Sequence, residues 1–278
     1  MPKFSIITIC YNDPNLERTC ASIASQTFQD FEWIVIDGGS NAETLAMFDK
    51  YRDRIDVFVS ERDRGIYDAL NKGVRRASCD YVNFMNAGDM FANDGVLARM
   101  NDEIQSGDEI VYGYIYYTLN GKLQRTFRVP MDKIKKDPCY WISQGLPHQA
   151  MFFRRDLFEK HGFYDISMPV FSDWDLNIKF WNGGVRFRFV DLCVSHFDHT
   201  GVSSDYWSLK SIQDRYLIIT RHFPEVADQW DFKHPLVSYI AYKAVRFLVL
   251  PFTSVRRKLR NKYTVLKLVH KYNILNKR

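Results

Sequence analysis

The chain has 278 residues, of which 46% are hydrophobic and 26% charged, as in an ordinary soluble globular protein. This length allows one large α/β domain or two small ones. The five cysteines are scattered and form no CxxC pair, which argues against a zinc ribbon or a disulfide framework and favours a reducing compartment. The N-terminus has no charged region followed by a long apolar run, so no signal peptide is expected.

The net charge of +5 is unevenly distributed. The last segment, 232–278, contains twelve Lys or Arg and no Asp or Glu, which leaves 26 basic and 33 acidic residues in the rest of the chain. A mildly acidic body with a basic tail indicates a polyanionic neighbour for the tail, either an anionic membrane or nucleic acid.

The first part of the chain alternates strand-like and helix-like segments. Apolar runs predict strands at 3–10, 31–37, 55–59 and 80–86, and helical spacing predicts helices at 14–25, 41–52 and 66–77. Such alternation predicts an α/β fold with a mostly parallel sheet, right-handed crossovers and helices on both faces. Ligands bind beyond the carboxyl ends of the strands in sheets of this kind. We therefore expect the polar segments 11–12, 37–40 and 86–89 to gather at one edge.

From about residue 108 the pattern changes. A hairpin is predicted over 109–129 with Asn120-Gly121 as its turn, followed by helices at 155–161 and 173–182, a strand at 185–194 and a helix at about 206–222. The apolar segment 235–252 is interrupted by Lys243 and Arg246 and broken by Pro251, so it is too short and too charged for a transmembrane helix. Together with the basic residues after it, this segment is typical of an amphipathic element on an anionic membrane. A basic helical pair packed on the body and an oligomer contact are the alternatives.

Five strings carry a specific resemblance to a known family. In chain order they are SIITICYN, FEWIVIDGGS, SERDRGIYDALNKGVRRASCDYVNFMNAGDMF, PHQAMFFRRDLFEKHGFYD and FSDWDL. Together they resemble the family 2 glycosyltransferases of the GT-A fold, the kind found in bacterial capsule, O-antigen and colanic-acid gene clusters. The resemblance spans roughly residues 1 to 205 and does not include the tail. It implies a Rossmann-like GT-A domain over 1–230, with a donor half at about 1–107 and an acceptor half at about 108–230, and a basic helical segment at 231–278.

The resemblance implies a nucleotide-sugar at the predicted edge. Asp37 and the segment from Thr8 to Asn12, with Tyr11, are expected to line the base and ribose pocket. Asp37 would accept a base N–H or a ribose hydroxyl, and Gly38-Gly39 would allow close approach of the backbone. The alternative is that Asp37 only caps the next helix.

By the same resemblance, Arg64, Asp68 and Asn71 lie beside the donor. Because Arg64-Gly65 precedes a helix, this loop can present backbone N–H groups and a guanidinium to a phosphate or sugar. Without the resemblance, Asp68 and Lys72 would be an ordinary i,i+4 pair on a solvated helix face.

The stretch Asn86-Ala87-Gly88-Asp89 lies where the family places its DXD-like motif, which binds Mg²⁺ or Mn²⁺ between the two phosphates. Many relatives have carboxylates at the positions of Asn86 and Gly88, whereas here only Asp89 remains. We expect Asp89 to be the metal ligand, because a hard cation keeps several waters and needs few protein ligands, and Asn86 to contact the ribose or a metal-bound water. The alternative is a plain Asn-Gly turn with a capping Asp.

The resemblance also assigns roles in the second part of the chain. Asp173 falls on the family's general-base position, at a helix start where it would also be a good cap. His148 is expected near the acceptor or the diphosphate, and Trp174 in the core or in the wall of the acceptor site. His199 is a candidate to complete the metal shell, although an isolated loop histidine is more often plain surface.

The sequence therefore predicts an inverting, metal-dependent transferase that moves a sugar from a UDP-sugar to a polyprenyl-diphosphate-linked glycan. Its place would be the cytoplasmic face of the bacterial plasma membrane, bound through the tail, in lipopolysaccharide or capsule synthesis. A non-catalytic nucleotide-sugar or glycan-binding protein of the same fold is one alternative, for which the reduced motif at 86–89 would be the sign. A nucleic-acid-binding protein is the other, but the body is acidic and carries no recognised nucleic-acid motif.

Overall fold

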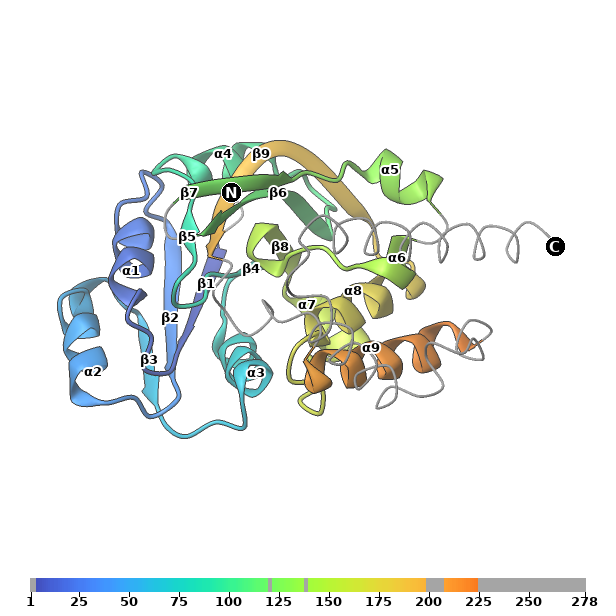
Figure 1. Cartoon of the computed structure of the whole chain (residues 1–278). Helices are drawn as coiled ribbons and strands as arrows, with labels where there is room; N and C mark the ends of the chain where they lie inside the picture. Colours follow the sequence, from blue (N-terminus) through green and yellow to red (C-terminus); the bar gives the residue numbers. More distant parts are fainter. Residues whose placement is uncertain (1–3, 120–121, 138–139, 199–207, 225–278) are drawn as a thin grey trace. The chain divides into compact units, whose positions relative to one another are not determined.

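The computed structural model describes residues 4–119, 122–137, 140–198 and 208–224 (Figure 1). The chain divides into two compact units, 1–204 and 205–278. In the second unit the described element is helix α9 (Leu209–His222), which confirms the helix expected there. The expected domain boundary at 230 stays a prediction, because 225–278 lie outside the described ranges. No helix among the described residues is long and apolar enough to cross a membrane.

The first unit is built on a mixed sheet. Within the described residues it has nine strands in the order β3-β2-β1-β4-β8-β6-β9-β5, with β7 paired to β6. The strands are β1 (Phe4–Cys10), β2 (Phe31–Asp37), β3 (Val57–Ser60), β4 (Tyr81–Phe84), β5 (Met90–Phe91), β6 (Ile110–Leu119), β7 (Lys122–Phe127), β8 (Met151–Arg154) and β9 (Phe187–Asp198). Strands β1 to β4 are parallel, as the alternating pattern predicts. Strand β8 lies antiparallel between β4 and β6, and β5 and β7 are antiparallel to their partners.

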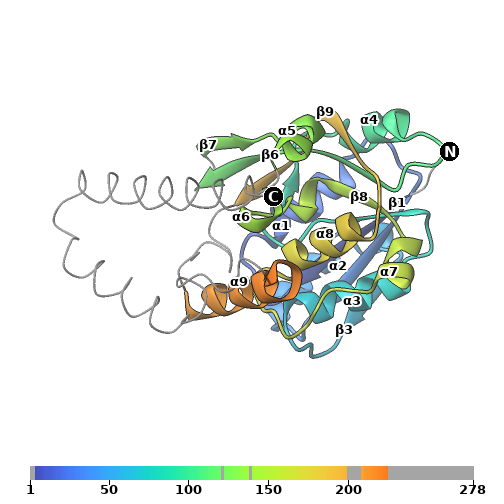
Figure 2. The same ribbon diagram turned by 90° about the vertical axis from the view of Figure 1, so that its right-hand side faces the viewer.

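Helices cover both faces of the parallel strands, with α1 and α2 on one side and α3 on the other (Figure 1). The helices of this unit are α1 (Leu16–Ala24), α2 (Ala42–Asp49), α3 (Ile66–Arg76), α4 (Val96–Glu103), α5 (Met131–Lys136), α6 (Tyr140–Ser143), α7 (Asp156–His161) and α8 (Ser172–Asn182), with 3-10 turns η1 (Arg52–Arg54) and η2 (His148–Ala150). Helix α7 packs against α8 (Figure 2). Helix α3 approaches β1 so closely that a Cβ on Gly73 would lie 2.4 Å from Ile7 Cγ2, which only a glycine permits.

The core follows the period-2 alternation of β1 and β2. Side chains such as Phe4, Ile6 and Trp33 are fully buried and form one cluster with Leu16 and Cys20 of α1. Side chains of the opposite parity, such as Ile7, face α3. Apolar side chains are therefore buried on both faces of the sheet.

Strand β4 ends two residues earlier than expected, at Phe84. The chain nevertheless continues beside β1, because the N–H of Met85 bonds Ile7 O (2.9 Å) and that of Ala87 bonds Ile9 O (2.9 Å). The turn that follows is thus held at the carboxyl end of β1.

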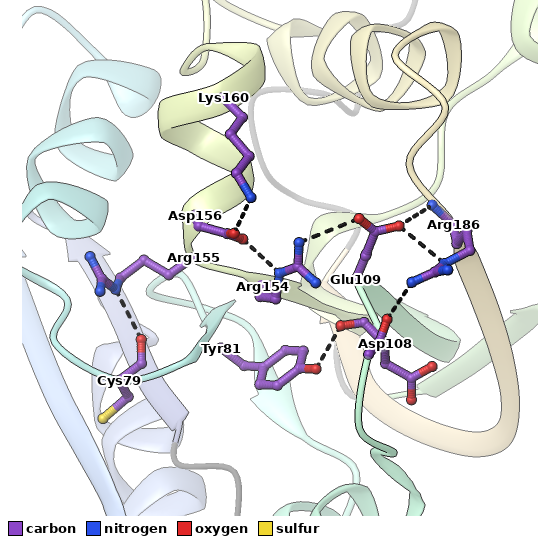
Figure 3. A network of polar contacts seen from close by, with 10 residues as sticks. Cys79, Tyr81, Asp108, Glu109, Arg154, Arg155, Asp156, Lys160 and Arg186 are labelled. Carbon is purple, nitrogen blue, oxygen red and sulfur yellow. Dashed lines mark hydrogen bonds and ion pairs between the residues drawn. The ribbon is translucent and has the colours of Figure 1, made fainter.

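Ion pairs connect the strands at the opposite end of the sheet, where β4, β6 and β9 begin (Figure 3). Arg154 Nη2 lies 3.4 Å from Glu109 Oε1, and Arg186 Nε lies 3.2 Å from Glu109 Oε2. Arg188 Nη2 lies 2.6 Å from Asp108 Oδ2. We call these five residues the amino-end network.

Candidate active site

The carboxyl ends of β1, β2 and β4 meet at one edge, as predicted. Strands β1 and β2 end on a register pair, Cys10 and Asp37. Asn12 then adopts a left-handed conformation (φ 51°), which Asn tolerates. Its N–H bonds Ser40 Oγ (2.9 Å), and its side-chain oxygen accepts the N–H of Asn41 (2.8 Å). Segments 11–13 and 37–41 are therefore tied together, and 86–89 lies beside them through β1.

Two of the expected donor-binding side chains face inward. Asp37 is fully buried, and its carboxylate accepts the Ser60 hydroxyl (2.6 Å) and the N–H groups of Gly39 (3.1 Å) and Ser40 (3.0 Å). Because the side chain is fully buried and these bonds tie it to segment 39–40 and to Ser60, the structure favours the role of holding the loop. Thr8 was expected to line the base and ribose pocket, but it is fully buried in this structure. Its hydroxyl accepts the indole N–H of Trp33 (3.0 Å), so it faces the core and not the pocket.

Tyr11 and Asn12, by contrast, are exposed at the edge, with 67% of Tyr11 accessible. They are the members of the expected base and ribose set that offer surface to a ligand. Gly38 lies close to another side chain, because a Cβ there would stand 2.6 Å from Asp63 Oδ2.

Arg64 lies just before helix α3, whereas Asp68 and Asn71 lie within it, and the three side chains have different surroundings. The carboxylate of Asp68 accepts the N–H of Arg64 (3.0 Å) and its guanidinium (3.2 Å). Burial would raise the pKa of Asp68, but the bonds from Arg64 and the charge of Lys72 outweigh it and lower the pKa. The Arg64 side chain remains 73% exposed, which leaves it able to contact an anion. Asn71, by contrast, donates its side-chain Nδ2–H to Tyr164 O (2.9 Å) and accepts the N–H of Tyr164 at Oδ1 (3.0 Å). It therefore links α3 to the backbone at Tyr164 and does not lie at an open surface.

The DXD-like turn is held by α1. Gly88 has φ +96°, and the N–H of Asp89 bonds Asn86 O (2.9 Å). Thr19 accepts the N–H of Gly88 (2.9 Å) and donates to Asp89 O (2.6 Å), while Arg18 donates to Gly88 O. The carboxylate of Asp89 is 5% exposed and accepts Gln149 Nε2 (3.1 Å). An Asn-Gly turn is therefore present, but it is specifically supported.

His148 lies against this turn. Its Nε2 is 3.2 Å from Asn86 Nδ2, and burial lowers the pKa of His148 to about 4, so the ring is neutral near pH 7. As assigned, the amide donates to Nε2, which places the ring proton on Nδ1. His148 Nδ1 and Asn86 Oδ1 are both buried and have no hydrogen-bond partner within the part of the chain that the structure describes. This edge therefore holds one unused donor and one unused acceptor on two residues in contact.

Gln149 is a site residue that the sequence reasoning missed. It follows His148 in the string PHQ, and its side chain is the one that reaches Asp89. Its carbonyl also accepts Asn83 Nδ2 (3.3 Å) from the buried strand β4. A polar residue inside an otherwise apolar strand, such as Asn83, was the signal available in the sequence.

Asp173 lies in the first turn of α8, where it was expected. It is half-buried, and its Oδ1 accepts the Tyr67 hydroxyl (3.1 Å) and the N–H of Trp174 (2.9 Å). The second bond comes from the next residue in the chain, and the N-cap of α8 is Phe171, so the structure does not place Asp173 as the helix cap. Asp175 points elsewhere, with Oδ2 2.8 Å from Lys179 Nζ, and Trp174 is buried with its indole N–H on Trp141 O (2.8 Å).

Among the described residues, no three His, Cys, Asp or Glu side chains are grouped so that they could hold a metal ion. The DXD-like turn still presents two kinds of oxygen to a cation, the carboxylate oxygens of Asp89 and the side-chain Oδ1 of Asn86. Among the described residues, Asn86 Oδ1 has no hydrogen-bond partner. Carboxylate and amide oxygens suit Mg²⁺ or Mn²⁺, which keep several waters or phosphate oxygens. The turn therefore fits a hard cation that takes most of its ligands from elsewhere. His199, the other expected ligand, lies outside the described residues, as does the tail.

A family model described as glycosyl transferase family 2 matches residues 5–162. A PGL/p-HBAD biosynthesis glycosyltransferase of Mycobacterium tuberculosis is 32% identical over 228 residues, which cover 79% of this chain and 86% of that protein. The protein of the same name from Mycobacterium bovis has the same identity and coverage.

Solved structures share the fold. TarS 1–349 of S. aureus in complex with UDP-GlcNAc matches with a TM-score of 0.64 at 18% identity, covering 86% of this chain and 71% of that one. The match spans 43% of the longer TarS chain. The mannosyltransferase PcManGT of Pyrobaculum calidifontis, in complex with GDP-Man and Mn²⁺, matches with a TM-score of 0.62 at 17% identity, covering 96% and 81%. The family model and the 32% identical relatives carry the conclusion that the chain belongs to glycosyltransferase family 2, as an enzyme of the GT-A fold.

Proposed function

We propose that this glycosyltransferase is an inverting, divalent-cation-dependent enzyme that transfers a sugar from a UDP-sugar to a saccharide acceptor. The observation that carries the proposal is the pair of unused buried atoms, Asn86 Oδ1 and His148 Nδ1, beside the carboxylate-bearing turn of Asp89. Leaving a buried polar group unpaired costs about 1–3 kcal/mol, so such groups are expected where a ligand completes them.

The donor lies across the carboxyl ends of the strands. Tyr11 and Asn12 contact the base and ribose, and the exposed guanidinium of Arg64 contacts the diphosphate. The neutral ring of His148 donates its Nδ1–H to a phosphate or sugar oxygen, and Asn86 accepts a ribose hydroxyl or a cation-bound water. A divalent cation held by Asp89 would offset the charge that builds on the leaving diphosphate.

Asp173 is the general base. The acceptor hydroxyl loses its proton to the Asp173 carboxylate while its oxygen forms a bond to the anomeric carbon. The bond from that carbon to the diphosphate oxygen breaks on the opposite face, and its electron pair leaves with the diphosphate. Attack from that face inverts the anomeric configuration.

The acceptor is a polyprenyl-diphosphate-linked glycan of the cell envelope, such as a lipopolysaccharide or capsule precursor. The relatives named for PGL/p-HBAD biosynthesis support a cell-envelope glycan, the polyprenyl-diphosphate carrier follows only the family resemblance, and the choice of UDP follows the TarS complex with UDP-GlcNAc. The basic segment 232–278 fits an anionic surface, which suits an enzyme at the cytoplasmic face of a bacterial plasma membrane.

Deleting 232–278 is expected to abolish binding to anionic vesicles. The segment has twelve basic and no acidic residues, and each basic residue near such a surface contributes about 1 kcal/mol. Flotation of full-length and truncated protein with anionic and neutral vesicles measures this. Equal flotation of both proteins with anionic vesicles would show that the tail has another role.

The proposed function is tested by a panel of UDP- and GDP-sugars, each with Mn²⁺ or with EDTA. Binding is followed by thermal shift, and turnover by release of the nucleoside diphosphate. A UDP-sugar is expected to raise the melting temperature and to be consumed only with the metal present. Consumption of a donor in EDTA would contradict the metal dependence, and donor binding without turnover under any acceptor would favour a non-catalytic role.

A further inference from the structure

A buried tyrosine of α3 lies against the proposed base. Tyr67 sits in the first turn of α3 and is 6% exposed. Its hydroxyl donates to Val170 O at 2.7 Å and to Asp173 Oδ1 at 3.1 Å. A hydroxyl has one proton to donate, so these two acceptors compete for it.

The surroundings keep that proton on Tyr67. Burial and then the charge of Asp173 raise the pKa of Tyr67 well above its ordinary value. Among the described residues, the pKa values of Tyr164 and Tyr117 are also raised, mainly by burial. The negative charge of Asp173 raises both as well. Arg125, 4.3 Å above the ring of Tyr117, lowers the pKa of Tyr117 only in part. All three phenols therefore stay neutral over the pH range in which a carboxylate titrates.

Helix α3 also fixes the chain that leads into α8. Asn71, one turn after Tyr67, binds the N–H and the carbonyl of Tyr164, and Tyr67 binds the carbonyl of Val170. The rings of Tyr67 and Tyr164 pack with centroids 5.3 Å apart. Two side chains of one helix thus anchor both ends of the segment 164–170, and Asp173 lies three residues after its end.

We propose that Tyr67 is a positioning residue for Asp173, whose hydroxyl holds the ionised carboxylate and turns to Val170 O when Asp173 takes the acceptor's proton. This inference rests on the proposed function. In the ionised state the hydroxyl donates to Oδ1 and, with the N–H of Trp174, fixes the rotation of the carboxylate. In the protonated state the carboxyl group attracts the phenolic proton less, and the carbonyl at 2.7 Å receives it. The proton stays on Tyr67 throughout, and only the direction of the O–H bond changes.

The arrangement has a chemical consequence. The Tyr67 hydroxyl has an acceptor whether Asp173 is ionised or protonated. Protonation of Asp173 therefore leaves no buried donor without a hydrogen bond. While Asp173 is ionised, the bond from Tyr67 favours that form and lowers its affinity for protons. Removing the hydroxyl should therefore raise the pKa of Asp173 and loosen its orientation.

Tyr67→Phe tests this role, with Tyr164→Phe as the matched control. The Tyr164 hydroxyl is buried near the same base but has no hydrogen-bond partner among the described residues, so the same change removes no known bond there. In Tyr67→Phe we expect kcat to fall about tenfold with the KM of each substrate within about twofold. The acidic limb of the kcat profile should move to higher pH by about half to one unit, while that of Tyr164→Phe stays at the wild-type position.

A second readout does not depend on transfer. Carbon-13 NMR of labelled aspartates, with Asp173 assigned through Asp173→Asn, is expected to show a higher pKa of Asp173 in Tyr67→Phe than in wild type and in Tyr164→Phe. If Asp173→Asn keeps normal transfer, the proposed base is wrong and the role of Tyr67 falls with it. If Asp173→Asn is inactive but the pKa and the acidic limb of Tyr67→Phe match the control, the inference about Tyr67 alone is overturned.

Discussion

The two ends of the sheet differ in whether their polar side chains have partners inside the protein. In the amino-end network every guanidinium has a carboxylate within reach, and the pair of Arg188 and Asp108 is the shortest at 2.6 Å. At the carboxyl end, Asn86 and His148 are in contact with each other, yet each keeps a buried atom that has no partner in the described ranges of the chain. Such atoms also occur elsewhere, as at Ser195, but here they lie on neighbouring residues beside a carboxylate.

In this protein, polar groups that hold the fold together differ from polar groups that can bind a ligand in whether they have partners inside the protein. Charges that satisfy one another connect strands and leave little to offer a ligand. The amino end even has a hollow of about 730 Å³, lined in part by Arg186, Arg188 and Asp108, but these charges already bind inside the protein. A hollow alone is therefore a weaker sign of a site than unused hydrogen-bonding capacity.

Asp173→Asn should give the largest effect at the carboxyl end. We expect transfer to fall at least about a hundredfold, because the amide cannot take the acceptor's proton. Donor binding should stay within about threefold, because the side-chain shape is kept. Single-turnover transfer and calorimetric donor titration measure the two quantities. Near wild-type transfer by the variant would remove Asp173 from the mechanism.

His148 gives the carboxyl end its own pH dependence. Burial lowers the pKa of His148 from 6.5 to about 4, so the unfolded chain takes up the proton first as the pH falls. Stability contributed by the neutral ring is full above pH 6.5 and is lost toward pH 4, with about 2 kcal/mol gone at pH 5. Urea unfolding at pH 7 and pH 5 should show that His148→Gln loses less stability on acidification than wild type. Equal losses in both proteins would show that the ring is not held neutral.

Asp108→Asn addresses the amino-end network and should give the smallest functional effect. Burial would raise the pKa of Asp108, but the hydrogen bonds of Arg188 outweigh it and lower the pKa, so the ionised form stabilises the fold. We expect a loss of about 1–3 kcal/mol in the free energy of unfolding and no change in transfer per folded molecule. Reduced kcat at a temperature where the variant is fully folded would break the distinction between the two ends.

The local pattern of the sequence was enough for the parallel half of the fold. Alternating apolar runs and helical spacing place β1 to β4 and α1 to α3 within a few residues. Strand β5 has two residues and α6 has four, which is too short for periodicity to register. The antiparallel insertion of β8 between β4 and β6 is a long-range pairing that no local pattern encodes.

Side-chain direction limited the prediction of the site. The turn of Asp89 and the helix start of Asp173 lie in the elements where the sequence placed them. Thr8 and Asn71 lie in predicted elements too, but one faces the indole of Trp33 and the other the backbone at Tyr164. The direction of each side chain depends on which face of the strand or helix it occupies and on which distant residues pack against that face. The sequence alone does not show these partners.

In the proposed function the carboxyl end of the sheet is a donor site that metal and nucleotide complete together. One carboxylate gives a hard cation little to replace its water shell, so the free enzyme should bind Mn²⁺ weakly, and UDP should supply the missing oxygens. Asn86→Asp should tighten the metal, because it adds a second carboxylate to the turn. The most direct measurement is calorimetric titration of UDP into wild type, Asp89→Ala and Asn86→Asp, with Mn²⁺ or with EDTA. We expect Mn²⁺ to tighten UDP binding at least about tenfold in wild type and not in Asp89→Ala. Equal UDP affinity of wild type in Mn²⁺ and in EDTA would contradict it.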